Sequence, residues 1–167
     1  MLLTGLLPDI STDPAIETAT DSIEAGRSGT IVAPVGIRPP LLAAVASRAA
    51  TPLVVLTATG RDAESLTNAL ASWIPGVAML PAWETLPHER LSPQVDTMAR
   101  RIAVLRRLVH PIEGDESAGP LSVLVVPIRA FLQPIISGLA DLEPVRVRTG
   151  DILDLTDVTN RLAELGY

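Results

Sequence analysis

The sequence contains no cysteine and no lysine, and only four of its 167 residues are aromatic. Without cysteine the chain cannot form a disulfide, a thiolate nucleophile or a cysteine-based metal site, and a reducing cytosol is the expected compartment. Without lysine it cannot form a Schiff base or supply the lysine of a phosphate-binding loop. All thirteen basic residues are arginine.

Long apolar runs are also missing. No run approaches the roughly 20 apolar residues that a membrane-spanning helix needs, and the start, MLLTGLLPDISTD, lacks the basic region of a signal peptide. We therefore expect no membrane contact. The net charge of −6 argues against general affinity for nucleic acid.

The apolar residues, 47% of the chain, are mostly aliphatic and fall into short runs. Strands are expected at 29–35, 51–57, 76–80 and 121–127, and helices at 13–25, from about 40, 60–74, 93–110 and briefly after 127. The runs 51–57 and 121–127 are uniformly apolar, which is typical of strands buried on both faces. Alternating strands and helices predict an α/β fold, a parallel sheet with helices on both faces.

The pattern changes near residue 142. Val145 and Val147 alternate with Arg146 and Arg148, which predicts a strand with one solvated face. A helix is expected from about Asp154, its apolar face formed by Leu155, Val158, Leu162 and Leu165. One strand and one helix cannot bury a core. We therefore expect an α/β domain at 1–142 and the truncated start of a second domain at 143–167.

The first strand-to-helix turn is where an α/β protein would bind phosphate. It reads APVGIRPP and keeps a single glycine, Gly36. Pro39 and Pro40 stand where a phosphate-binding loop has lysine and a hydroxyl, and they remove two N–H donors from the helix start. We interpret the loop as inactive and expect no bound cofactor. The alternative is an anion site that uses Arg38.

No other catalytic or metal-binding pattern is complete. His88 and Glu89 begin an H-E-x-x-H motif, but Ser92 stands at the second histidine position. His110, the only other histidine, is expected at a helix end, where it would favour the helix dipole. We expect no metal ion and no catalytic residue.

The arginine-rich segment 99–108, ARRIAVLRRL, is the one basic feature. The expected buried stripe of its helix contains Met98, Ile102, Leu105 and Val109. Arg100 and Arg107 would point away from this stripe, with Arg101 and Arg106 at its flanks. The arginines form either a solvated helix face or, together with Arg146 and Arg148, a candidate surface for an anionic protein or a nucleic-acid backbone.

One of two tryptophans, Trp83, stands in a proline-bracketed segment after the third expected strand. Prolines restrict this connection, and we expect Trp83 to be the structural anchor that packs it onto the domain.

The segment 80–108 resembles the signature of the transcription-repair coupling factor (Mfd) family. The matching residues are Pro81, Trp83, Glu84, Thr85, Leu86, Pro87, Ser92, Pro93 and Asp96. The segments 124–133 and 145–167 resemble the segments that follow in that family, in the same order.

This resemblance implies an ATP-driven DNA translocase as the parent protein, which displaces stalled RNA polymerase and recruits UvrA for nucleotide excision repair. It implies that this region is similar to UvrB, with a helicase-like α/β domain, a lost phosphate-binding loop and an inserted second domain. The UvrA contacts of the family lie on the inserted domain, mostly beyond Tyr167. DNA and RNA polymerase would be reached through other domains of the parent.

We therefore expect a non-catalytic protein-interaction and regulatory module. The alternatives are a residual nucleotide-binding domain that uses Arg38, and a DNA-contacting module that uses the Arg100–Arg107 helix face. A helicase-like sheet without its remaining strands should expose apolar edges, so self-association is also expected.

Overall fold

A small parallel sheet forms the centre of the protein. The structure, a computed structural model, describes residues 3–84, 94–143, 145, 147 and 150–164. Within these residues the sheet has three strands, β1 (Leu53–Thr57), β2 (Val77–Met79) and β3 (Val123–Pro127). Their order is β1-β3-β2, and both pairs are parallel. The α/β class with a parallel sheet is thus confirmed.

The central strand β3 carries the core on both faces. All five of its residues are buried, as its apolar run predicts. On one face Val123 and Val125 pack with Ala43 of α3 (Arg38–Arg48) and Leu70 of α4 (Gly60–Leu70). On the other face Leu124 and Val126 pack with residues of α5 (Val95–Val109), chiefly Val104 and Leu105.

Two helices begin at residues whose side chains cap them. Asp13 caps α2 (Pro14–Glu24) by accepting a hydrogen bond from Ala15 N at 2.9 Å. Thr59 and Asp62 form a reciprocal cap at the start of α4, since Thr59 accepts from Asp62 N and donates to its carboxylate. The remaining helical segments are α1 (Leu7–Ser11), α6 (Ile128–Phe131), α7 (Leu155–Glu164), and the 3-10 turns η1 (Thr4–Leu6), η2 (Val35–Ile37) and η3 (Leu139–Asp141).

The strand predicted at 29–35 does not form. These residues belong to no strand, and Val32 is 95% exposed. An isolated extended segment has no ladder of hydrogen bonds to hold it, so its β-branched residues cannot form a strand by propensity alone.

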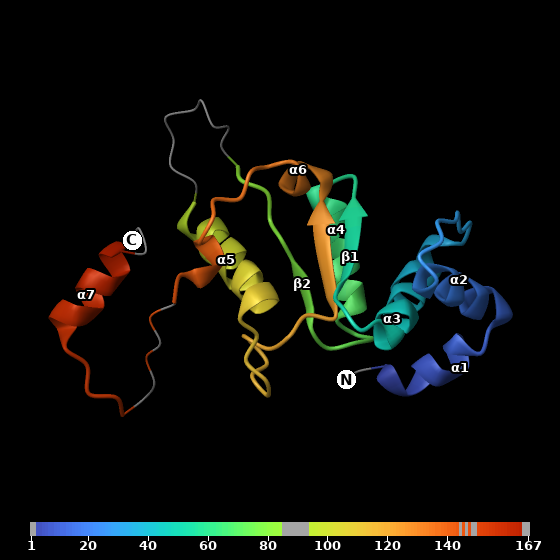
Figure 1. Ribbon diagram of the computed structural model, residues 1–167, viewed down its shortest axis with the longest axis horizontal. Helices are drawn as coiled ribbons and strands as arrows, with labels where there is room; N and C mark the ends of the chain where they lie inside the picture. The colour runs from blue at the N-terminus through green and yellow to red at the C-terminus, as the bar shows by residue number, and fades with distance from the viewer. Residues whose placement is uncertain (1–2, 85–93, 144, 146, 148–149, 165–167) are drawn as a thin grey trace.

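The prediction that 51–57 is buried on both faces is also wrong. Val54 and Leu56 are 52% and 48% exposed. β1 is an edge strand, and among the described residues no strand lies on its other side (Figure 1). The helix that covers the second face, α5, packs over β2 and β3 and leaves that face of β1 open.

The last segment stands apart from this body. Figure 1 shows α7 separated from the sheet and from the helices that cover it. The predicted helix is confirmed, and Leu155 on its apolar face is 79% exposed. Val145 and Val147 form no strand. Arg146 and Arg148, like Leu165, lie outside the described residues.

Candidate functional site at the carboxyl edge of the sheet

Three features that the sequence marks lie around the carboxyl ends of the strands, where parallel α/β sheets usually bind ligands. The start of α3 faces the end of β1 across a cavity. The Trp83 segment, which we define as Pro81–Glu84, follows β2. The helix α6 begins directly after β3.

The start of α3 has few features of an anion site. Its N-cap, Ile37, makes no side-chain capping bond, and Pro39 and Pro40 in the first turn carry no N–H. Gly36 has no positive φ, and a Cβ at this position would meet no atom within 4 Å. Neither the backbone conformation nor a close contact therefore requires glycine there.

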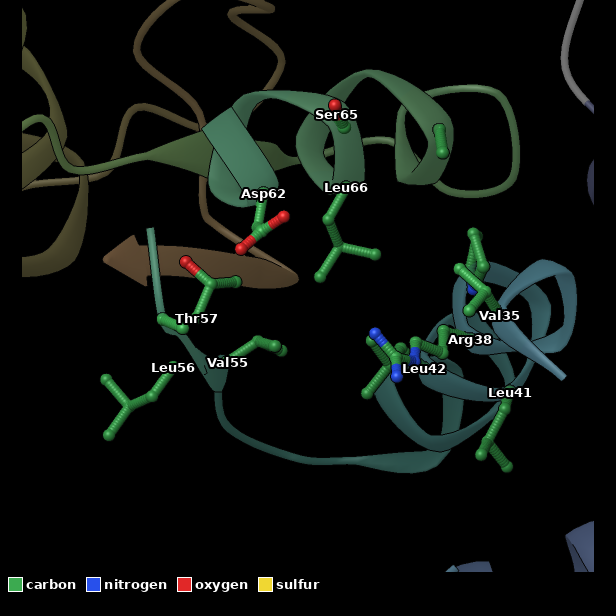
Figure 2. A pocket seen from close by; sticks show the side chains of 13 residues that line it. Val35, Arg38, Leu41, Leu42, Val55, Leu56, Thr57, Asp62, Ser65 and Leu66 are labelled. Carbon is green, nitrogen blue, oxygen red and sulfur yellow. The ribbon is translucent and has the colours of Figure 1, made fainter. Parts of the chain in front are cut away.

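An open cavity of about 530 Å³ separates α3 from β1 and α4 (Figure 2). Its lining is mostly aliphatic, and its polar groups are Arg38, Thr57, Asp62 and Ser65. The Asp62 carboxylate is occupied by the hydroxyl of Thr59 at 2.8 Å, and the Thr57 hydroxyl donates to Thr59 O at 3.0 Å. Within the described part of the chain no carboxylate forms an ion pair with Arg38, so Arg38 is the cation that this cavity offers.

The Trp83 segment is held from one side by α5. Arg101 Nη1 donates a hydrogen bond to Pro81 O at 2.6 Å. The guanidinium carbon of Arg101 lies 4.5 Å from the centre of the Trp83 ring, within the range of a cation–π interaction.

Residues of α6 and of the turn after it hold the same segment from the other side. Gln133 Oε1 accepts from Trp83 N at 2.7 Å, and Gln133 Nε2 donates to Trp83 O at 3.2 Å. Arg129 Nη2 donates to Glu84 O at 3.1 Å. One amide side chain thus satisfies both backbone groups of Trp83.

The carboxylate of Glu84 lies at the start of α5. It accepts a hydrogen bond from the hydroxyl of Thr97. This bond lowers the pKa of Glu84 below its usual value, with smaller contributions from the backbone N–H groups of Glu84 and Gln94. A carboxylate in this position is also stabilised by the positive end of the helix dipole.

Arg101, predicted at the flank of the buried stripe as part of a solvated face or a partner surface, is instead fully buried. It is 0% exposed, and burial lowers the pKa of its guanidinium. The buried residues of α5 are Thr97, Arg101, Val104 and Leu105, whereas Val109, expected in the buried stripe, is 56% exposed. The apolar pattern of α5 predicted a different buried face. A hydropathy pattern assigns arginine to the surface and does not reveal that the Trp83 ring and Pro81 O contact the buried Arg101.

The other arginines of α5 mostly bind within the chain. Arg106 donates to Leu142 O at 3.3 Å and pairs with Glu143 at 3.4 Å. Arg107 Nε donates to Gly119 O at 2.8 Å, and burial lowers the pKa of its guanidinium. Arg100 is half exposed and lies 3.8 Å from Asp96. Arg146 and Arg148 lie outside the described residues, so the structure does not place the whole candidate surface.

Histidine and acidic side chains form no cluster of three or more suited to a metal ion in the ranges that the structure describes. His110 Nε2 lies 2.7 Å from Asp141 Oδ1 at the end of α5. The candidate motif at His88, Glu89 and Ser92 lies outside the described residues. None of the described helices is long and apolar enough to cross a membrane.

The sequence shares 45% identity over 139 residues with the transcription-repair-coupling factors of Mycobacterium bovis and Mycobacterium tuberculosis, covering 83% of this chain. Across these residues the chain belongs with the transcription-repair-coupling factors. The factor of Escherichia coli is 29% identical over 96 residues, 57% of this chain and 8% of that protein. The chain spans only 11% of the length of the mycobacterial factors. No protein-family model matches it.

These relatives confirm the family resemblance. The sequence marked Trp83, but it did not identify Thr97, Arg129 or Gln133 as residues that contact the Trp83 segment. No local pattern indicates them, because Gln133 lies 50 residues from Trp83 along the chain.

Proposed function

We propose that this chain is the UvrB-like, non-catalytic N-terminal part of a transcription-repair-coupling factor. It would act as a protein-interaction and regulatory module that helps to recruit UvrA to RNA polymerase stalled at a DNA lesion. The observation that carries the non-catalytic reading is the start of α3, where two prolines and an uncapped first turn replace the donors of a phosphate-binding loop. The chain also has no lysine to contact a phosphate.

The parent protein would be an ATP-dependent DNA translocase, with its motor and its polymerase contacts in other domains. The open edge of β1 supports a helicase-like sheet that further strands of a longer polypeptide complete, since exposed edges are normally paired or covered. The relatives are long enough to supply them, because this chain corresponds to 11% of their length.

The segment 143–167 would be the beginning of an inserted, UvrA-binding type of domain. The exposure of Leu155 on the apolar face of α7 supports this proposal, because an amphipathic helix of this kind is stabilised by packing against a neighbour. Residues beyond Tyr167 would provide that neighbour and most of the UvrA contacts.

A pull-down with UvrA tests the recruitment proposal. This chain is compared with a longer version that extends past Tyr167 through the rest of the inserted domain. We expect the longer version to retain UvrA and this chain to retain little. Equal, strong retention by this chain would place the UvrA contacts within residues 1–167, and retention by neither would contradict recruitment through this region.

A residual nucleotide-binding domain is the second candidate function. The cavity beside Arg38, about 530 Å³, is the observation that favours it. Titration calorimetry with ATP distinguishes the two candidates, with Arg38→Ala as the control. We expect no heat of binding. Micromolar affinity that is lost in Arg38→Ala would replace the non-catalytic proposal by the second one.

A DNA-contacting role for α5 receives less support. Arg101 is buried, and Arg106 and Arg107 donate to backbone carbonyls of the chain. Of these four arginines, Arg100 is left most open to an anionic partner.

A further inference from the structure

A positive charge is buried beneath the Trp83 segment without a counter-charge in the described part of the chain. Arg101 is 0% exposed, and no described carboxylate forms an ion pair with it. Within the residues that the structure describes, its Nη1 has one acceptor, Pro81 O, whereas Nε and Nη2 have no hydrogen-bond partner. Desolvation of a guanidinium costs free energy that one hydrogen bond and one aromatic ring do not fully offset. Among the described residues, the contacts of Arg101 therefore offset only part of the cost of burying its charge.

The geometry of Arg101 explains the presence of arginine at this position. A guanidinium is planar, so one side chain can stack on a ring and donate in its own plane at the same time. Arg101 does both to neighbouring residues, stacking on Trp83 and donating to Pro81 O. These two contacts fix the position and the direction of the segment, which an aliphatic side chain of similar volume could not do.

The Trp83 segment is also held from the side opposite α5. Gln133 binds both backbone groups of Trp83. The segment starts beside β3, because Leu80 N donates to Val125 O at 3.0 Å. The helix α6 and Gln133 follow β3 along the chain, and α5 packs on the face of the sheet that carries Leu124 and Val126. The Trp83 segment therefore connects α5 with the α6 region at the carboxyl edge of the sheet.

We infer that Arg101 and Gln133 form a latch that holds the Trp83 segment closed over this edge. Arg101 is a positioning residue, kept for the placement of the segment at a cost to the stability of the domain. Loss of either half of the latch lets the segment open locally while the sheet and α5 remain folded. This role for Arg101 goes beyond the proposed function and does not depend on it.

Fluorescence of Trp83 measures the latch directly. The chain has two tryptophans, so Trp83 is the only tryptophan in a Trp73→Phe background and can be excited selectively over tyrosine. In this background Arg101→Met removes the charge and the hydrogen-bond donors but keeps an unbranched apolar side chain. Arg101→Lys keeps the positive charge but loses the planar guanidinium that can stack on a ring. Arg100→Met, the adjacent position on the exposed side of α5, is the matched control. Emission maximum, quenching by acrylamide and the thermal midpoint are recorded for each.

We expect Arg101→Met and Arg101→Lys to shift Trp83 emission to longer wavelength and to raise its quenching constant about two-fold or more, because a locally opened segment exposes its side chains. The thermal midpoint of Arg101→Met should equal or exceed that of the background protein, since a desolvated charge has been removed. Arg100→Met should change neither emission nor quenching.

Two results would overturn the inference. One is unchanged emission and quenching in both Arg101 variants. The other is a lowered midpoint of Arg101→Met with Trp83 still shielded in the folded protein, which would make Arg101 a residue that stabilises the core. If Arg101→Met does not fold, Gln133→Ala provides the second arm. It should expose Trp83 without affecting α5, and unchanged quenching in this variant would equally contradict the latch.

Discussion

The carboxylate of Glu84 accepts a hydrogen bond from the hydroxyl of Thr97 in the first turn of α5. This bond lowers the pKa of Glu84. A carboxyl group whose pKa is lowered by folding stabilises the protein above its unfolded pKa, and this contribution is lost as the pH falls through the folded value. The bond therefore makes the attachment of the Trp83 segment to α5 sensitive to acid.

We expect Glu84→Gln to be less stable than the parent near neutral pH and to approach it in acid. The difference should shrink as the pH falls below the ordinary titration range of glutamate, because the carboxyl group of the parent then becomes protonated and loses its charge. Thermal midpoints measured across this range check the expectation. A constant difference at every pH would show that the charge of Glu84 contributes nothing.

Trp83→Ala should lower the free energy of unfolding by about 2 kcal/mol, since it removes a half-buried ring and its cation–π contact with Arg101. Denaturant unfolding measures the loss. Trp83→Phe retains a ring and is the control, with an expected loss of less than half as much. An unchanged stability of Trp83→Ala would mean that the ring does not anchor its segment.

Gly76→Ala should destabilise the protein by about 2 kcal/mol or more. Gly76 has a φ of 72°, and a Cβ there would lie 2.9 Å from Pro120 O and from Ser122 N, both backbone atoms. Gly36→Ala is the matched control, because Gly36 has neither a positive φ nor a close neighbour. It should be neutral or slightly stabilising. A large loss at Gly36 would indicate a conformational demand on that loop.

The open edge of β1 should cause self-association at high concentration, because unpaired backbone groups and exposed apolar side chains lie together there. Light scattering should show dimers or larger species. Val54→Lys should reduce them by placing a charge on the edge strand, and Val32→Lys, which changes an exposed residue outside the sheet, should not. A clean monomer of the parent chain at high concentration would count against this expectation.

The sequence predicts those parts of the fold whose cause is local. Asp13, Pro14 and Gly26 delimit α2 because capping acts over a few residues. The apolar run of β3 predicts its burial because the central strand has neighbours on both sides.

The sequence fails where the cause is a distant partner. Apolar runs at 29–35 and 53–57 both predicted strands, but among the described residues the first has no strand beside it and the second has a strand on one side only. Arg101 is assigned to the surface by its charge, whereas its burial depends on Pro81, 20 residues earlier in the chain. The composition of the Trp83 segment identifies it in the sequence, but nothing in the sequence predicts its contacts with Gln133.

The strand order has a consequence for synthesis on the ribosome. β1 and β2 come first in the chain, but they touch only through β3, which is made last. About 70 residues separate Leu53 from its partner Val123, and such non-local pairings slow folding because a long loop must close first. The nascent chain must therefore carry two unpaired apolar strands until Val123–Pro127 emerges from the ribosome. During that interval the helices α3 and α4, which form from local contacts, can shield these strands.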